Sequence, residues 1–87
     1  MKADKVKINS LLKTAAGQIE GISKMVEDDR YCIDISNQIL AVQSILKKAN
    51  KEIIKAHMEM CVKQAFEEGN EREKIDEVIS LIDKISK

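Results

Sequence analysis

The segment that decides the fold is residues 31–66, which read YCIDISNQILAVQSILKKANKEIIKAHMEMCVKQAF. It contains neither glycine nor proline, the two residues that most often end a helix. The residues of its apolar face recur at steps of three and four, which is the spacing of one side of an α-helix. They are Ile35, Ile39, Val42, Leu46, Ala49, Ile53, His57 and Cys61. The segment therefore predicts one long amphipathic helix.

A shorter helix is predicted before this segment. Residues 6–26 carry apolar side chains at helical spacing, and the acidic run 27–29 interrupts the pattern. We expect Asp28 or Asp29 to turn the chain and to cap the long helix. Asp34 then falls in the first turn of that helix, where a negative charge complements the helix dipole.

A third helix is predicted over residues 73–85, where Ile75, Val78, Ile79 and Ile82 repeat at helical spacing. Gly69 lies between the second and third helices and is expected to adopt the left-handed conformation that ends many helices. The sequence thus predicts an all-α fold with three helices in short–long–short order, forming a single domain over residues 1–87.

Composition limits the classes of protein to which the chain can belong. At 87 residues, with one Phe, one Tyr and no Trp, the core must be aliphatic and small, and such domains often complete it by oligomerising. Fifteen basic and fifteen acidic residues cancel, so net charge gives no support to a nucleic-acid partner. The charged N-terminus and the absence of a long apolar run predict a cytoplasmic protein with no signal peptide and no membrane span.

Three residues form a candidate metal site. His57 and Cys61 are four residues apart, so on a helix they lie on one face and can bind one ion. Cys32 precedes His57 by 25 residues, and an unbroken helix would separate the two by roughly 37 Å. In an antiparallel dimer, however, Cys32 of one subunit can lie beside His57 and Cys61 of the other. The spacing therefore predicts two equivalent intersubunit sites in a two-fold dimer.

The ligand types also select among metals. Two thiolates and one imidazole make a soft site of low coordination number, which suits Cu(I). Structural zinc usually takes four protein ligands, and this chain has no third Cys and no second His. Glu59 or a water molecule could complete a tetrahedron, so a zinc site stays open as an alternative. No arrangement of base and nucleophile and no cofactor loop indicates an enzyme or a small-molecule substrate.

The chain resembles the copper-sensitive operon repressor family, a branch of the CsoR/RcnR metal-responsive repressors. The resemblance covers nearly the whole sequence and rests on three stretches, which are GQIEGI at residues 17–22, DRYC at 29–32 and HMEMCV at 57–62. Cu(I) sensors of this family carry Cys, His and Cys at the places of Cys32, His57 and Cys61. The resemblance implies an antiparallel four-helix-bundle homodimer that pairs into a homotetramer.

Two further residues match the copper branch of the family. Tyr31 directly precedes the first Cys, and Glu77 falls at the place of an acidic residue in the third helix. The resemblance implies that both hydrogen-bond the non-ligating nitrogen of the His and couple metal binding to shape, in keeping with the general role of residues behind metal ligands. Persulfide-sensing relatives lack the His, and nickel or cobalt sensors replace the second Cys by His, so copper fits best.

The sequence departs from the family in its DNA-binding residues. Relatives carry several Arg just before the Gly-Gln pair of the first helix, whereas this chain reads LLKTAA at residues 11–16. Lysines are left as candidates for phosphate contacts, although Lys lacks the planar fork of Arg. These lysines are Lys5, Lys7 and Lys13 in the first helix and Lys47 and Lys48 in the second.

The resemblance implies a Cu(I)-sensing repressor that binds operator DNA without metal and is released by Cu(I), which derepresses copper-resistance genes. Two alternatives remain. One is a persulfide- or thiol-sensing repressor in which Cys32 and Cys61 of different subunits become linked. The other is a cytosolic copper-binding protein that binds no DNA.

Overall fold

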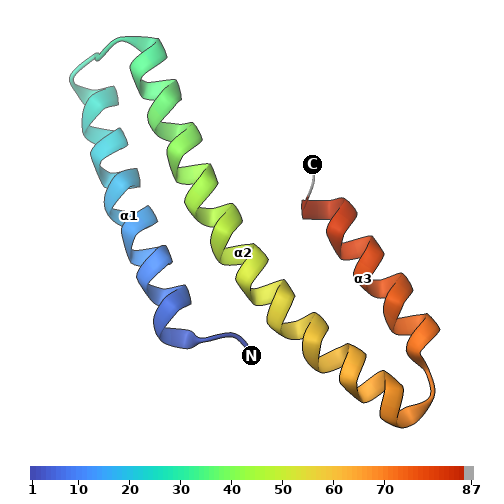
Figure 1. Cartoon of the computed structure of the whole chain (residues 1–87). Helices are drawn as coiled ribbons and strands as arrows, with labels where there is room; N and C mark the ends of the chain where they lie inside the picture. The colour runs from blue at the N-terminus through green and yellow to red at the C-terminus, as the bar shows by residue number, and fades with distance from the viewer. Residues whose placement is uncertain (86–87) are drawn as a thin grey trace. The chain divides into compact units, whose positions relative to one another are not determined.

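The computed structural model describes residues 1–85 and confirms the all-α prediction (Figure 1). Helix α1 spans Lys5–Glu27, α2 spans Cys32–Glu68 and α3 spans Glu71–Ile85. The order is short–long–short as expected, and each predicted boundary lies within two residues of the observed one. The predicted domain reaches Lys87, and its last two residues lie outside the described range.

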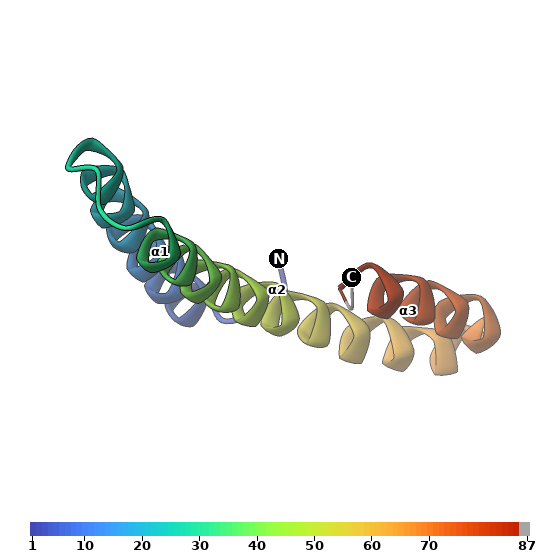
Figure 2. The same ribbon diagram turned by 90° about the horizontal axis from the view of Figure 1, so that it is seen from above.

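Two compact units make up the described chain. The hairpin unit, residues 5–49, consists of α1 and the first part of α2, which run antiparallel and side by side (Figures 1 and 2). Its buried side chains are Ile8 and Ala15 from α1 and Val42 and Ala49 from α2. Burial of a side chain the size of Ile8 or Val42 contributes about 1.5–3 kcal/mol, so two such positions and two alanines make a thin core. A chain with almost no aromatic residues has little else to bury.

The turn between α1 and α2 differs in one respect from the prediction. Asp29 does turn the chain, since it has a φ of 52°. The Arg30 amide donates to the Met25 carbonyl and the Asp29 amide donates to the Val26 carbonyl, a pattern that closes the C-terminus of α1. The prediction that Asp28 or Asp29 caps α2 is wrong, because Tyr31 occupies that position and its carbonyl accepts the Ile35 amide. The acidic run at residues 27–29 therefore ends α1, and Tyr31, the residue directly before α2, occupies the capping position of that helix.

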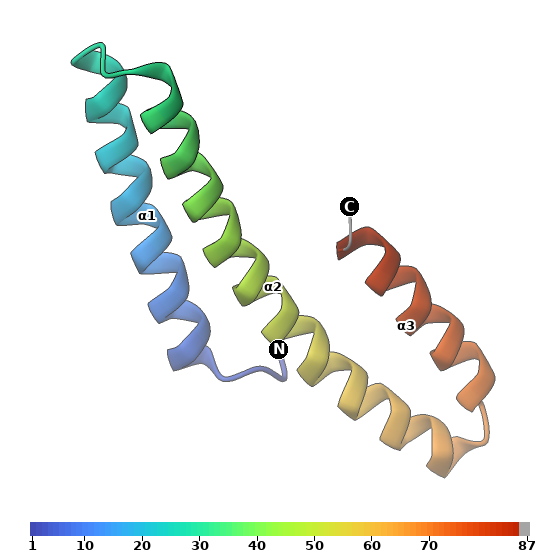
Figure 3. The same cartoon turned by 45° about the horizontal axis from the view of Figure 1, so that its top comes forward.

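The second unit, the α3 unit, contains residues 1–4, α2 from Asn50 onward and α3. Within it α3 turns back and runs antiparallel to the end of α2 (Figure 3). Gly69 makes this reversal with a φ of 78°, as predicted, and both the Gly69 and the Asn70 amides donate to the carbonyl of Ala65. Ala65 is 1% exposed, so it is a buried position close to this end of α2.

A regular row of apolar side chains on the hairpin unit is left exposed. Each member follows an inward-facing residue of the same helix by four positions, so the row flanks one side of the antiparallel pair. We call it the heptad stripe, and its members are Leu12, Ile19 and Val26 of α1 with Ile39 and Leu46 of α2, all 42–56% exposed. Cys32 begins α2 seven residues before Ile39 and therefore shares the register of the stripe. The hairpin thus presents an apolar face with a thiol at one end.

Among residues 1–85, no helix is both long enough and apolar enough to cross a bilayer.

Candidate metal centre

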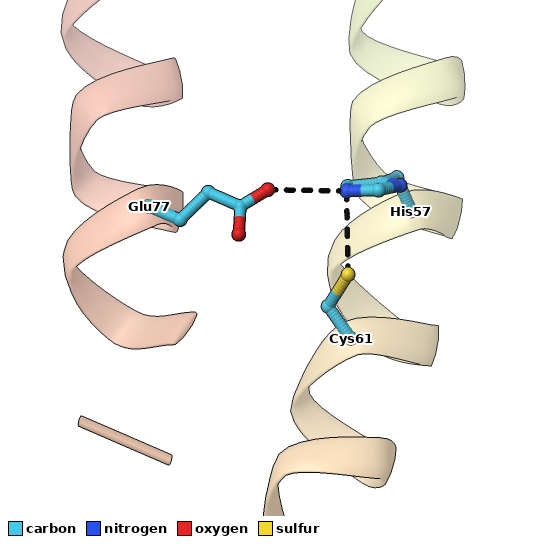
Figure 4. Close-up of side chains that lie close together, drawn as sticks. All are labelled: His57, Cys61 and Glu77. Atoms are coloured by element: carbon cyan, nitrogen blue, oxygen red, sulfur yellow. Dashed lines mark hydrogen bonds and ion pairs between the residues drawn. The ribbon is translucent and has the colours of Figure 1, made fainter. Parts of the chain in front are cut away.

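The candidate metal-binding side chains of the α3 unit meet where α2 and α3 run alongside each other. His57 and Cys61 project from successive turns of α2, and Glu77 projects from α3 towards them (Figure 4). The Cys61 Sγ lies 3.2 Å from the His57 Nε2, and the Glu77 Oε1 lies 3.4 Å from the same nitrogen. The three ligand atoms all lie within 4.8 Å of one another. One imidazole nitrogen therefore faces both a thiol and a carboxylate.

The charge around Glu77 favours its ionised form. Its hydrogen bond with His57, together with the Lys74 ammonium 3.5 Å from its Oε2, lowers the pKa of this carboxyl below its ordinary value. Lys74 lies one helical turn before Glu77 on α3 and holds the oxygen that His57 does not contact. Glu77 is thus an acceptor with one oxygen directed at the His57 ring.

The cluster is open to solvent on part of its surface. The side chains of His57 and Glu77 are 50% and 44% exposed, and Cys61 is half-buried with a free thiol. A partly exposed thiol beside an imidazole is accessible to a metal ion, and its thiolate is the form that binds. These three side chains pack against one another, and their exposed surfaces also allow a metal ion to reach them and to leave.

Cys32 and Tyr31 lie at the start of α2, in the hairpin unit, and are not members of this cluster. Both side chains are exposed, and Cys32 is a free thiol. Of the three predicted ligands, the cluster contains His57 and Cys61 and does not include Cys32. Helix α2 runs without interruption from Cys32 to Glu68, as the intersubunit prediction required.

The family resemblance had assigned Glu77 a hydrogen bond to the imidazole, but helical spacing alone did not foresee two features of the cluster. The carboxylate nearest the His57–Cys61 pair comes from Glu77, whereas Glu59, which was considered as a further ligand, is not part of the cluster. Lys74 was not identified as a partner of Glu77, although their separation of three residues on a helix was a usable signal. The contact between residues 57 and 77 depends on how α2 and α3 pack, which helical periodicity does not specify.

The candidate DNA-contacting lysines all belong to the hairpin unit, and all five are exposed. α1 runs antiparallel to α2, so its first half lies beside the middle of α2 (Figure 1). Lys5, Lys7 and Lys13 are therefore at the same end of the hairpin as Lys47 and Lys48, far from the turn at residues 28–31. The structure places these charges on one part of the hairpin, where they add to a local positive potential.

Within one chain, the described side chains supply part of the donor set that suits a soft metal ion. A thiol and an imidazole lie at ligand spacing, and a second thiol lies exposed on a different unit of the chain. Sulfur and nitrogen donors in low number suit Cu(I), whereas hard cations prefer carboxylate and carbonyl oxygens. The pair therefore supplies two of the three donors that the sequence predicted.

Sequence comparisons place the chain among metal-responsive regulators. Residues 4–84 match the model of the metal-sensitive transcriptional repressor family. The copper-sensing transcriptional repressor CsoR of Bacillus subtilis (strain 168) is 38% identical over 84 residues, which are 97% of this chain and 83% of that protein. The protein of the same name from Mycobacterium ulcerans (strain Agy99) is 42% identical over 71 residues, 82% of this chain. The matched part is 61% of the length of that mycobacterial protein.

Solved structures support the same relationship. The copper-sensing repressor CsoR with Cu(I) from Geobacillus thermodenitrificans NG80-2 superimposes with a TM-score of 0.80 at 36% identity, covering 100% of this chain and 94% of the other. The nickel-responsive transcriptional regulator InrS superimposes with a TM-score of 0.82 at 27% identity, covering 98% of this chain and 96% of the other. The family match, the identities and the shared fold agree, and the chain belongs to the metal-sensitive transcriptional repressor family.

Proposed function

We propose that this protein is a cytoplasmic Cu(I)-responsive transcriptional repressor, which binds operator DNA without metal and loses affinity for that DNA when Cu(I) is bound. The observation that carries the proposal is the thiol–imidazole pair of Cys61 and His57, 3.2 Å apart, in a chain that also presents a free Cys32. Relatives of similar sequence are named copper-sensing repressors, and one related structure is described with Cu(I).

The ligands proposed for Cu(I) are Cys32, His57 and Cys61. In the single chain the Nε2 of His57 lies beside both the Glu77 carboxylate and the Cys61 thiol; in the proposed Cu(I) form Nε2 keeps its contact with Glu77 and Nδ1 coordinates the ion. A hydrogen bond from Nε2 to a carboxylate fixes the tautomer and the orientation of a ligating imidazole. Two thiolates and one imidazole provide the soft, low-coordinate environment in which Cu(I) is stable.

The third ligand is proposed to come from a second copy of the chain. Cys32 shares the register of the heptad stripe, and the stripe is an apolar surface that one hairpin leaves uncovered. Covering it with the same stripe of an antiparallel partner would make a four-helix bundle. That arrangement brings Cys32 of one protomer towards His57 and Cys61 of its partner. Pairing of two such dimers into a tetramer is part of the same proposal.

Tyr31 and Glu77 are proposed to couple the metal to the shape of the protein. Glu77 belongs to α3 and contacts the ligand His57 on α2, so a change in the orientation of the imidazole is transmitted to α3. Tyr31 lies immediately before Cys32 and would reach the same imidazole from the partner protomer. Residues in these positions orient ligands and carry strain from the metal to neighbouring elements.

The DNA-binding surface is proposed to be the lysine-bearing end of the hairpin, with Lys5, Lys7, Lys13, Lys47 and Lys48 contacting phosphates. Two-fold and higher symmetry would repeat this patch and build a broad basic face from a chain with no net charge. Phosphate contacts by lysine supply affinity that falls as salt rises and carry little sequence information.

Thermodynamic linkage makes the effects of Cu(I) and DNA on each other reciprocal. If bound Cu(I) weakens DNA binding by some factor, DNA must weaken Cu(I) binding by the same factor. Couplings of this kind are typically about 1–3 kcal/mol, which corresponds to a change in affinity of roughly 5–150-fold.

The test combines metal and DNA binding. Anaerobic titration should show one Cu(I) per subunit, held against a Cu(I) chelator, and Cys32→Ala, His57→Ala or Cys61→Ala should each abolish it. DNA from upstream of the protein's own gene should be bound by the metal-free protein and released as Cu(I) is added. Failure to bind that DNA at low salt would contradict the repressor and leave a copper-binding protein. Release by persulfide in the His57→Ala variant would instead support a thiol sensor.

A further inference from the structure

We infer that His57, Cys61 and Glu77 form a second metal site, which binds Zn(II) within a single subunit and competes with the intersubunit Cu(I) site. The existence of the site depends only on the geometry of the α3 unit. Its regulatory meaning rests on the proposed Cu(I)-responsive function. The same two residues of α2 would then take part in either of two sites, and the third ligand would decide which metal is bound.

Two of the three separations between the ligand atoms are close to the edges of a zinc tetrahedron. Zinc bonds of about 2.0–2.1 Å to nitrogen and oxygen and 2.3 Å to sulfur give edges of roughly 3.3 Å between N and O and 3.6 Å between N and S. The observed distances are 3.4 Å from Nε2 to the Glu77 oxygen and 3.2 Å from Nε2 to the Cys61 sulfur. Since the atoms already lie within 4.8 Å of one another, small rotations of side chains would complete the site.

The donor types also differ from those of the Cu(I) site. One thiolate, one imidazole and one carboxylate are all ordinary zinc ligands, and a water molecule fills the fourth place in many open sites. Replacing a thiolate by a carboxylate makes the set harder, which favours a divalent ion over Cu(I). The exposure of His57 and Glu77 gives a water ligand access to the ion. Lys74 holds the other oxygen of Glu77 and leaves Oε1 facing the cluster.

The two sites exclude each other because they use His57 differently. Glu77 accepts a hydrogen bond from Nε2 in the Cu(I) mode, and Nδ1 faces the ion. In the Zn(II) mode Nε2 is itself a ligand, and Glu77 becomes one as well. Both modes also need the Cys61 thiolate, so a chain cannot hold both ions at once.

The choice of third ligand gives the two metals different consequences. A Zn(II) ion on Glu77 links α2 to α3 within one chain and makes no use of Cys32. A Cu(I) ion on Cys32 links two protomers. Zinc should therefore occupy the protein without producing the intersubunit closure that lowers DNA affinity. Differential binding to the two states is what a metal needs in order to shift the equilibrium between them.

The experiment is a paired titration of the reduced protein with Zn(II) and with Cu(I), each against a competing chelator. Four variants are compared with the unmodified chain: Cys32→Ala, Glu77→Gln, Cys61→Ala and the control Glu73→Gln, which removes a neighbouring α3 carboxylate outside the cluster. We expect Cys32→Ala to keep its Zn(II) affinity within about twofold while losing the Cu(I) site. We expect Glu77→Gln to lose roughly 10–100-fold in Zn(II) affinity and to keep one Cu(I) per subunit.

A Co(II) spectrum provides a second readout that does not depend on affinity. Co(II) at the site should show tetrahedral absorption bands and a thiolate charge-transfer band in Cys32→Ala, and Cys61→Ala should lose the charge-transfer band. Circular dichroism checks that each variant remains helical. Loss of Zn(II) binding in folded Cys32→Ala, or equal Zn(II) affinities of Glu77→Gln and Glu73→Gln, would overturn the inference. Neither outcome depends on whether the protein binds Cu(I) or DNA, so the two proposals fail separately.

Discussion

His57 lies between two different kinds of partner, and this position governs the chemistry of the site. Its Nε2 faces the Cys61 thiol and the Glu77 carboxylate, while the other ring nitrogen is available to an ion (Figure 4). The helical spacing of four residues predicted that His57 and Cys61 share a face of α2, and the structure confirms this. The sequence could not predict the contact with Glu77 from its spacing, because residues twenty apart meet only through tertiary packing; a family resemblance suggested it.

Replacement of Tyr31 tests the proposed coupling at this scale. Tyr31→Phe removes one hydroxyl and keeps the ring and the backbone carbonyl that accepts the Ile35 amide. We expect one Cu(I) per subunit to remain, with an affinity lower by about 10-fold and a smaller effect of Cu(I) on DNA binding. Chelator competition measures the first quantity, and DNA anisotropy with and without Cu(I) measures the second. Unchanged affinity and unchanged coupling would remove Tyr31 from the mechanism.

The elements follow closely from local sequence signals. The absence of glycine and proline between residues 31 and 66 predicted the length of α2, and Gly69 predicted its end. The start of α2 was harder to predict, since an Asp beside a helix can either cap the next helix or close the previous one. Asp29 closes α1 in the left-handed conformation, and the main-chain bond pattern that decides between the two roles is invisible in composition.

The two left-handed residues provide a matched pair of stability tests. Gly69→Ala introduces a Cβ that meets no other atom within 4 Å, so its effect comes from the backbone conformation alone. We expect the free energy of unfolding to fall by about 1–2 kcal/mol. Asp29→Gly at the corresponding position of α1 relieves similar strain but adds backbone freedom to the unfolded chain, so the net change should be near zero. Urea denaturation at fixed protein concentration compares them, and equal losses for both variants would contradict the account.

At the scale of the whole molecule, one chain does not cover its own apolar surface. The heptad stripe stays exposed, and α3 also leaves Ile75, Ile79 and Ile82 exposed. Helical periodicity predicted which face of each helix is apolar. It could not tell which residues of that face form the core of one chain and which form an interface between copies. The structure leaves every stripe member exposed, and a second copy is the partner that we propose to cover them.

Leu46→Glu tests whether the stripe is the interface. Leu46 lies in the middle of α2 and is 42% exposed in the single chain. A carboxylate there would be desolvated by a partner subunit, so we expect the dimer dissociation constant to rise at least ~100-fold, with loss of tight Cu(I) binding. Ser44→Glu, on the exposed opposite side of the same helix, is the control and should remain dimeric. Sedimentation velocity measures both, and identical dissociation constants would rule out this face.

The lysine patch makes a prediction about salt. Lys13→Gln removes one proposed phosphate interaction per subunit from α1. Removing one such interaction should reduce the slope of log affinity against log salt concentration by about 0.9, so a dimer that engages DNA through both copies of Lys13 should show a decrease of roughly 1.8. DNA titrations at several salt concentrations measure the slope. An unchanged slope would show that Lys13 lies away from the DNA.

The central claim is that two subunits build each Cu(I) site, and a mixed dimer tests it most directly. Cys32→Ala and Cys61→Ala subunits carrying different affinity tags are co-expressed, and the heterodimer is isolated through both tags. One of its two sites then contains both substitutions, and the other contains Cys32, His57 and Cys61 intact. Titration against a Cu(I) chelator should give one tightly held ion per heterodimer and none in either homodimer. A heterodimer that binds no Cu(I) tightly, while the unmodified dimer binds two ions, would contradict the intersubunit site.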